Sequence, residues 1–296
     1  MSIRKIGTAL VGACLAFSLV ACAPKNEEPM KVLTPAGAPA LALLPLVEDE
    51  NVVIETVQGT DVLAAELSKK DSDYDVIVAP TNLGAKIYSQ AKTYSLEAVL
   101  TWGNLYLVGE QGADHQTEAI AAFGEKAVPQ LVFNKVLDAQ NLNVIYYASV
   151  QEAQQALLTK QQPIALLAQP AAAATIAKAK EQGRELTILA DLQKLWQQKT
   201  DSKDAGYPQA SLFVKEGVDA SYIVKKLSKT TLSEKDMKQK IEAIGADTLG
   251  LPNAELAIKT YQQQHIHFEK GKDVKDQIEA FLTLFGMNCP DELIKS

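Results

Sequence analysis

The stretch Tyr74-Asp75-Val76-Ile77-Val78-Ala79-Pro80-Thr81-Asn82 joins a buried strand to the start of a helix. Residues 74–79 are apolar enough to predict a strand, and Pro80 ends it because proline cannot continue the ladder of hydrogen bonds. Residues 82–90 then predict a short helix. This strand-to-helix turn belongs to a repeated alternation, and that alternation decides the fold class.

The alternation begins upstream, where two strands each precede a helical segment. The expected elements are a strand at 30–33, an apolar segment at 38–47 with Pro39 near its start, a β-branched strand at 52–57 and a helix at 61–69 capped by Thr60 or Asp61. Such a β-α-β-α-β-α order predicts a mostly parallel sheet that is covered on both faces.

A second cycle follows an extended segment at 96–108, which contains Trp102-Gly103-Asn104 and leaves the first unit. The expected elements of this cycle are a largely helical stretch at 118–140, strands at 143–147, 164–167 and 186–190, and helices at 150–159 and 171–181. A return strand at 209–214 leads back. Everything after 218 is expected to be helical, at about 219–229, 233–244, 253–263 and 273–285. Two α/β units joined by two crossings predict two lobes around a cleft.

The N-terminus carries a different signal. Arg4 and Lys5 precede an apolar run of about fifteen residues, and Leu19-Val20-Ala21-Cys22 resembles the lipobox of bacterial lipoproteins. The resemblance implies a signal peptide at 1–21, a lipid on Cys22 and a location on the extracytoplasmic face of the cell membrane. The alternative is a spanning helix, which needs about 20 residues. Residues 22–29 are polar and contain proline, which suits a short tether.

Removal of residues 1–21 leaves 275 residues and changes the formal net charge from −7 to −9, because Arg4 and Lys5 are lost. An acidic chain is a poor partner for nucleic acid or anionic lipid, so contact with the membrane is expected through the anchor only. Cys289 would be the one thiol besides Cys22, so the mature chain has no pair for a disulfide. Arginine occurs only as Arg4 and Arg184, and bidentate recognition of carboxylate or phosphate usually uses arginine.

Four marks in this order give the chain a specific resemblance: Gly37-Ala38-Pro39-Ala40-Leu41-Ala42, residues 74–82, Thr101-Trp102-Gly103-Asn104-Leu105-Tyr106-Leu107-Val108 and Tyr207-Pro208-Gln209-Ala210. The chain resembles the substrate-binding lipoproteins of bacterial ABC importers with the type II periplasmic-binding-protein fold, in the nitrate, sulfonate, taurine and thiamine-precursor branch. The resemblance implies one lobe at 30–105 and 212–296, an inserted lobe at 110–208 and hinges near 102–109 and 207–214. It also implies ligand capture by hinge closure and delivery to an ABC permease.

Two departures from the family pattern prevent a transfer of ligand identity. The family often has Glu-Pro where this chain has Gln169-Pro170, and its Gly-Lys opening of the second lobe is reduced to Phe123-Gly124-Glu125-Lys126. With no arginine in the cleft loops, we expect a neutral or weakly polar ligand, of which a heteroaromatic nutrient is one example.

Ligands of open parallel sheets lie beyond the carboxyl ends of the strands. The candidate ligand-binding residues at those ends are Pro35, Ala36, Gly37, Ala38, Gly59, Thr60, Thr81, Asn82, Trp102, Asn104, Ser149, Gln169 and Tyr207. Each has a structural alternative. The turn at 35–38 offers backbone donors or is a plain β-α turn, Thr81 and Asn82 bind ligand or cap their own helix, and Trp102 stacks on ligand or packs in the hinge. The Gln169 side chain either forms a hydrogen bond with an amide or ring nitrogen of the ligand or is a solvated loop residue. Tyr207 is expected mainly to contact the hinge.

No cofactor, metal site or catalytic grouping is expected. His265 and His267 would share a face only on a strand, and the residues before them predict a helix end. We therefore expect these histidines to be solvated and not to bind a metal. The competing hypotheses are an enzyme on the same scaffold that acts on a pyrimidine or menaquinone precursor, with Asp61 as its acid or base, and a surface adhesin or sensor.

Overall fold

The computed structural model describes residues 28–202 and 205–295. The expected signal peptide at 1–21, the proposed lipid site Cys22 and the tether up to residue 27 lie outside the described residues. Within the described ranges, no helix combines the length and the apolar character that crossing a bilayer requires.

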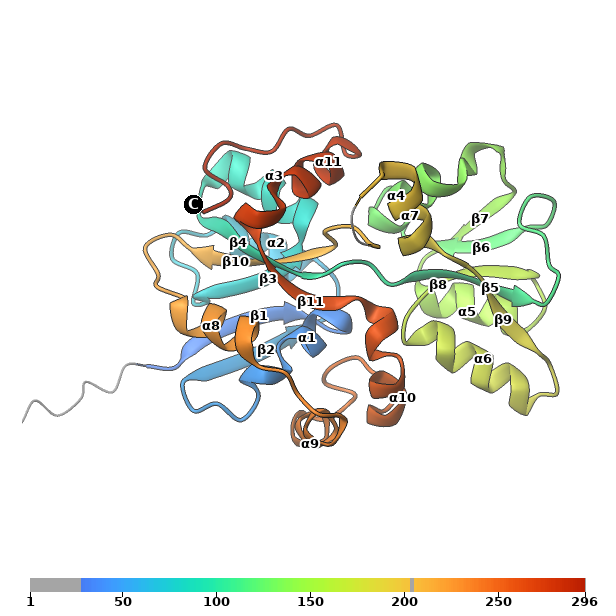
Figure 1. The fold of residues 1–296 in the computed structure, drawn as a ribbon, viewed down its shortest axis with the longest axis horizontal. Coiled ribbons are helices and arrows are strands. Elements are labelled where there is room, and N and C mark those ends of the chain that lie inside the picture. Colours follow the sequence, from blue (N-terminus) through green and yellow to red (C-terminus); the bar gives the residue numbers. More distant parts are fainter. Residues whose placement is uncertain (1–27, 203–204, 296) are drawn as a thin grey trace, which may run out of the picture.

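Two sheets lie side by side, and each is flanked by helices (Figure 1). The first sheet has the order β11-β4-β10-β3-β1-β2 and the second has the order β7-β6-β8-β5-β9. The strands of the first sheet are β1 (Met30–Pro35), β2 (Val52–Val57), β3 (Val76–Pro80), β4 (Tyr94–Thr101), β10 (Ala210–Lys215) and β11 (Ile266–Lys270). Those of the second are β5 (Leu105–Glu110), β6 (Ile120–Phe123), β7 (Val144–Tyr147), β8 (Ile164–Ala168) and β9 (Leu186–Asp191).

The helices follow the same division between the two sheets (Figure 1). Around the first sheet lie α1 (Ala38–Ala42), η1 (Leu44–Leu46), α2 (Asp61–Ser68), α3 (Thr81–Ala91), α8 (Ser221–Lys229), α9 (Glu234–Ile244), α10 (Ala254–Lys259), η3 (Tyr261–Gln264), η4 (Gly271–Val274) and α11 (Lys275–Thr283). Around the second lie α4 (Val128–Leu137), η2 (Ala139–Asn141), α5 (Val150–Leu158), α6 (Ala171–Glu181) and α7 (Leu192–Thr200).

The predicted α/β class with two sheet-based lobes is confirmed, but both sheets are mixed rather than mostly parallel. Strand β1 is parallel to β2 and β3, whereas β10 is antiparallel to both β3 and β4. In the second sheet, β6 is parallel to β7 and β8, whereas β5 is antiparallel to β8 and β9. Strand β11 is likewise antiparallel to β4. Strands β5 and β10 each follow a crossing, so the chain enters these two strands from the edge that the sheets share.

Two expected helical regions contain a strand instead. Residues 120–123 form β6 within the expected helical stretch 118–140, and residues 266–270 form β11 within the expected all-helical end. Ile120, Ala121 and Ala122 are all buried, and a short run that is buried on both faces has no period that separates strand from helix. Strand β11 follows His265, whose φ of 46° ends the preceding helical turn.

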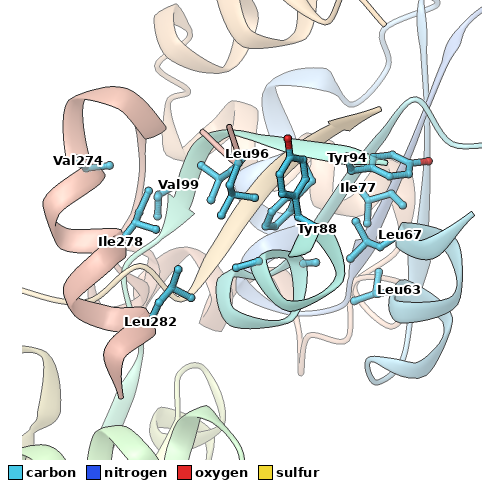
Figure 2. Close-up of a cluster of buried hydrophobic side chains, with 14 of the residues drawn as sticks. Leu63, Leu67, Ile77, Tyr88, Tyr94, Leu96, Val99, Val274, Ile278 and Leu282 are labelled. Carbon is cyan, nitrogen blue, oxygen red and sulfur yellow. The ribbon is translucent and has the colours of Figure 1, made fainter. Parts of the chain in front are cut away.

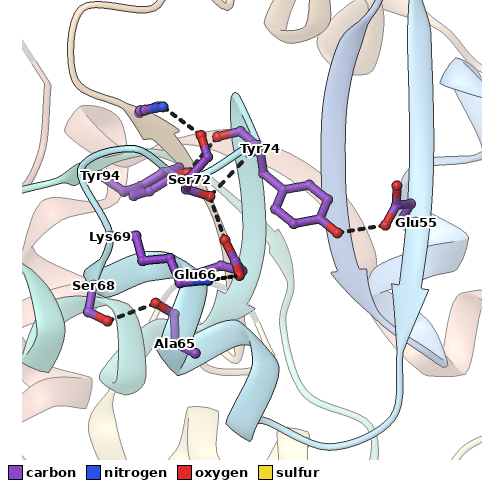
Figure 3. Close-up of polar contacts among 9 residues, drawn as sticks. Glu55, Ala65, Glu66, Ser68, Lys69, Ser72, Tyr74 and Tyr94 are labelled. Atoms are coloured by element: carbon purple, nitrogen blue, oxygen red, sulfur yellow. Dashed lines mark hydrogen bonds and ion pairs between the residues drawn. The ribbon is translucent and has the colours of Figure 1, made fainter.

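Polar contacts fix α2 and β3 beside the end of β2 (Figure 3). The Tyr74 hydroxyl donates to Glu55 Oε2 at 2.6 Å, and this bond raises the pKa of Tyr74 to about 12. The Ser72 hydroxyl donates to Glu66 Oε2 at 2.9 Å, and the Lys69 ammonium donates to Glu66 Oε1 at 2.5 Å. These contacts hold the loop between α2 and β3 against the last turn of α2 and against β2.

Helix α11 contributes to the cores of both lobes. Ile278 and Leu282 of this helix, together with Val274 at the end of η4, pack into the apolar cluster of the first lobe, as Figure 2 shows. Phe281 belongs instead to the cluster of the second lobe, where its ring stacks on that of Tyr207 with centroids 5.7 Å apart. The last long helix therefore stabilises a lobe to which it does not belong in sequence.

The two crossings between the sheets touch each other. The Tyr207 N–H donates to the Trp102 carbonyl at 3.1 Å, and the Gln209 N–H donates to the Thr101 carbonyl at 2.9 Å. Gly206 has φ of 116°, and a Cβ there would lie 2.1 Å from the Trp102 carbonyl oxygen. Only glycine fits this position, because any Cβ would overlap backbone that no side-chain rotation can move.

Gln193 of α7 holds both crossings. Its Oε1 accepts from the Leu105 N–H at 2.8 Å, its Nε2 donates to the Leu105 carbonyl at 3.1 Å, and its own carbonyl accepts from the Gly206 N–H at 3.2 Å. The side chain is fully buried. The Gln193 side-chain amide thus forms both backbone hydrogen bonds of Leu105, which a neighbouring strand would otherwise form, at the point where the chain leaves one sheet for the other.

The substitution Gly206→Ala is expected to lower the free energy of unfolding by about 3 kcal/mol or more, because the overlap adds to the strain of positive φ. Gly183→Ala is the matched control: Gly183 has φ of 73°, and a Cβ there would meet nothing within 4 Å, so a loss of about 1 kcal/mol is expected. Urea unfolding followed by circular dichroism measures both. Equal losses in the two variants would contradict the close contact between the crossings.

Candidate functional site

A cavity of about 760 Å³ lies between the two lobes. Its first wall comes from the β1–α1 turn, the start of α2 and the loop before α10. Its second wall comes from the end of β6 and the starts of α4, α5 and α6, and both crossings contribute to it. The lining residues are Ala36, Gly37, Ala38, Pro39, Thr60, Asn104, Leu105, Phe123, Pro129, Val150, Gln151, Gln154, Ala168, Gln169, Pro170, Ala171, Ala174, Gln209, Gly250, Leu251 and Pro252.

The sequence-based candidates divide into two groups. Those in the lining are Ala36, Gly37, Ala38, Thr60, Asn104 and Gln169. The structure places Pro35, Gly59, Thr81, Asn82, Trp102, Ser149 and Tyr207 behind or beside this lining, where most of them support its walls.

In the β1–α1 turn, protein carbonyls occupy backbone donors that were expected to face a ligand. The Ala36 N–H donates to the Val57 carbonyl at 3.0 Å, and the Gly37 N–H donates to the Leu249 carbonyl at 2.7 Å. Gly250 packs so closely that a Cβ there would lie 2.8 Å from the Ala36 Cβ. Of the two alternatives for this turn, these bonds favour the plain β-α turn at positions 36 and 37, because β2 occupies the Ala36 N–H and a loop far along the chain occupies the Gly37 N–H.

The second wall presents amide side chains and flat apolar faces. Ser149 caps α5 by accepting from the Glu152 N–H at 3.2 Å, so its hydroxyl serves the helix. Gln151 and Gln154 follow on α5 and line the cavity together with Phe123 and Pro129. Uncharged hydrogen-bonding groups next to an aromatic ring suit a flat ligand with polar edges.

A network of three amides forms the floor. Asn104 Nδ2 donates to the Gln169 carbonyl at 3.0 Å, and Gln209 Nε2 donates to Asn104 Oδ1 at 3.2 Å. Gln169 is 3% exposed: its Nε2 donates to Gln263 Oε1 at 2.7 Å and its Oε1 accepts from the Ala173 N–H at 3.2 Å. The alternative that Gln169 is a solvated loop residue is wrong, because its amide is buried and bonded to protein on both sides.

The remaining candidates lie behind the cavity lining and support its walls. The hydroxyls of Thr81 and Ser211 lie 2.8 Å apart in the buried interior, and Asn82 follows Thr81 at the start of α3. Pro35 ends β1, and Gly59, with φ of 76°, turns the chain before Thr60. Tyr207 is fully buried against Phe281, and burial raises the pKa of its hydroxyl. Tyr207 thus lies in the second crossing, where its N–H donates to the Trp102 carbonyl.

Trp102 also lies behind the cavity lining, where it packs against β11. Its ring stacks on that of His267, with centroids 5.1 Å apart and planes 8° from parallel, and its Nε1 donates to the His267 carbonyl at 3.3 Å. The Trp102 N–H donates to the His265 carbonyl at 2.9 Å. Burial lowers the pKa of His265. His265 therefore ends the helical turn η3, in line with the helix end expected from the sequence, whereas His267 lies on strand β11.

The cavity has an uncharged surface. Among residues 28–202 and 205–295, no Asp, Glu, Lys, Arg or His is part of its lining. Sequence reasoning missed Phe123, Gln151, Gln154, Gln209 and the stretch 250–252. Gln209 is part of the motif Tyr207-Pro208-Gln209-Ala210 and could have been found from it. No local sequence pattern, however, places residues 250–252 beside the β1–α1 turn.

Solved structures share this architecture. An ABC transporter structure from Parabacteroides distasonis is 21% identical, with a TM-score of 0.74 over 91% of this chain and 99% of that chain. The chain has the fold of ABC importer binding proteins. The periplasmic aliphatic sulphonate binding protein of Escherichia coli is 11% identical, with a TM-score of 0.63 over 88% of this chain and 87% of that one.

A third similar structure is the alkanesulfonate-binding protein of Xanthomonas axonopodis pv. citri bound to MOPS, which is 15% identical, with a TM-score of 0.57 over 88% of this chain and 93% of that one. No protein-family model matches the sequence, and no curated protein matches it. The likeness to these binding proteins therefore lies in the fold.

The substitution Asn104→Ala is expected to lower the free energy of unfolding by about 1–3 kcal/mol, because it leaves the buried Gln169 carbonyl and the half-buried Gln209 amide without partners. Asn51→Ala is the control: Asn51 Nδ2 makes an exposed bond to Asp49 Oδ1 at 3.1 Å, and a change within about 0.5 kcal/mol is expected. Urea unfolding of both variants provides the measurement. If the two losses match, the floor network does not stabilise the site.

Proposed function

We propose that this chain captures a small nutrient between two lobes and delivers it, unaltered, to the permease of an ABC importer. The observation that carries the proposal is the uncharged cavity of about 760 Å³ between two sheets that are joined by two adjacent crossings. A cleft between hinged lobes is a standard location for a small-molecule site. The shared fold of importer binding proteins supports the same function.

The proposed lobes are 30–105 with 212–296, and 110–208, with hinges near 102–109 and 207–214. Strands β1 to β4, β10 and β11 form one sheet and β5 to β9 form the other, which supports this division. Closure would bury the ligand by rotation at the crossings. Affinity then follows from the difference between ligand contacts in the open and closed arrangements.

The proposed ligand is neutral or weakly polar. A heteroaromatic compound is one example that fits the lining. The lining presents amides at Gln151, Gln154 and Asn104, a ring at Phe123 and apolar proline faces. An anion would gain no charged partner from these side chains and would lose its hydration on closure. We therefore assign ligand contact to the lining residues and a supporting role to the candidates behind them.

The proposed location is the extracytoplasmic face of the cell membrane, with a lipid on Cys22 as the anchor and the permease as the protein partner. The sequence at 1–22 supports this assignment: a basic start, a short apolar run and cysteine after small residues. We propose no enzymatic activity. Asp61, the acid or base that an enzyme here would use, is exposed in the first turn of α2 and lies outside the cavity lining.

Uncharged pyrimidines and nucleobases are expected to stabilise the protein in a thermal-shift screen, and sulfonates are not. A ligand at about 100 times its Kd adds about 2.7 kcal/mol, which raises the Tm on the order of 5 °C. Mass spectrometry of the recovered compound then shows whether it is unchanged. Stabilisation by sulfonates alone would contradict the neutral cleft, and conversion of the compound would indicate an enzyme.

The variant Ala174→Trp is expected to abolish that shift without unfolding the protein, because Ala174 is half-buried in the cavity lining and an indole fills the space. Ala65→Trp is the matched control, since Ala65 is exposed on α2. The Tm of each variant is measured with and without the compound found in the screen. A full shift in Ala174→Trp would place binding elsewhere.

A further inference from the structure

The turn before β11 is firmly attached to the first lobe. Gln264 in this turn is fully buried, and its Nε2 donates to the Ala257 carbonyl and to Thr260 Oγ1, each at 3.2 Å. Ile266, two residues later, pairs with Thr101 at the edge of the first sheet. The turn therefore moves with the first lobe.

The neighbouring residue of the same turn contacts the second lobe. The Tyr106 hydroxyl donates to the Gln263 carbonyl at 2.7 Å, and Gln169 Nε2 donates to Gln263 Oε1 at 2.7 Å. Tyr106 lies on β5 and Gln169 directly follows β8, and both belong to the interior of the second lobe. Burial raises the pKa of the Tyr106 hydroxyl, so it stays a donor at neutral pH.

The partner on the second lobe is fixed in direction. Gln169 Oε1 accepts from the Ala173 N–H, and the Gln169 N–H donates to the Asn104 carbonyl at 2.9 Å. These bonds leave Nε2 pointing across the gap toward Gln263. The amide-to-amide bond is thus set by the geometry of the second lobe and exists only while the lobes keep this arrangement.

Gln263 stands outside the lining of the large cavity. It lines a separate crevice of about 420 Å³ between α6 and α10, and Gln169 is the residue that the two cavities share. A change at Gln263 therefore alters the contact between the lobes without replacing any residue of the large cavity's lining.

We infer that Gln263 is a positioning residue that stabilises this arrangement of the lobes and so sets the balance between closed and open forms. Its consequence for ligand affinity rests on the proposed function, whereas the balance itself can be measured without ligand. Loss of one hydrogen bond of ordinary net strength shifts such an equilibrium about fivefold.

The test is single-molecule fluorescence energy transfer in the full chain without added ligand. Dyes are attached through keto amino acids at Gln90 on α3 and Gln155 on α5, which are exposed positions on opposite lobes. Gln263→Ala is expected to raise the ratio of separated to compact molecules about fivefold. Tyr106→Phe is expected to shift the ratio in the same direction, because it removes the bond to the Gln263 carbonyl.

Two controls separate this effect from a general loss of stability. Gln263→Glu keeps an oxygen that accepts from Gln169 Nε2, so its ratio is expected to stay near that of the unchanged chain. Gln262→Ala removes an exposed side chain of the same type at the adjacent position, and no shift is expected. A Gln263→Ala distribution equal to that of Gln262→Ala would overturn the inference. Because no ligand is present, that result is independent of whether the chain binds a nutrient.

Discussion

Two chain segments pass between the sheets in direct contact, and the rest of the molecule is arranged around that contact. The Trp102 carbonyl lies where a side chain at Gly206 would begin, and Gln193 binds Leu105 on one segment and Gly206 on the other. Since neither segment can move away without breaking buried hydrogen bonds, this contact fixes where the two lobes meet. The cavity adjoins it, because Asn104, Leu105 and Gln209 of these segments are part of the lining.

Amides rather than charges organise the site. At the floor, Asn104 donates to the Gln169 carbonyl and accepts from Gln209 Nε2, and the α5 glutamines line the cavity. A neutral network has no net charge that a ligand must neutralise, and its selectivity depends on matching donors with acceptors. The acidic charge of the chain, −7 in total, is therefore carried by other surfaces.

Local sequence predicted those elements whose pattern is complete within a few residues. The strand at 52–57 and the helix at 171–181 lie where their β-branched and alanine-rich runs indicate. Strand β6 was missed because Ile120, Ala121 and Ala122 are buried on both faces and show no period. The place of Trp102 could not be read locally either, since its stacking partner, His267, is 165 residues away.

The site divides in the same way. Ala36 to Ala38, Thr60, Asn104 and Gln169 stand at strand or crossing ends, where the topology rule directs attention, and they do line the cavity. That rule says nothing of the loop at 250–252, which follows α8 and α9 and packs against the β1–α1 turn. Long-range packing of this kind leaves no local pattern in the sequence.

Phe281 has a consequence for the order of assembly. A ribosome releases this polypeptide from its N-terminus, and residues 105–207 emerge well before residue 281. The aromatic core formed by Trp196, Tyr207 and Phe281 stays incomplete during that interval. The inserted lobe thus reaches its final packing only after nearly the entire polypeptide has been released.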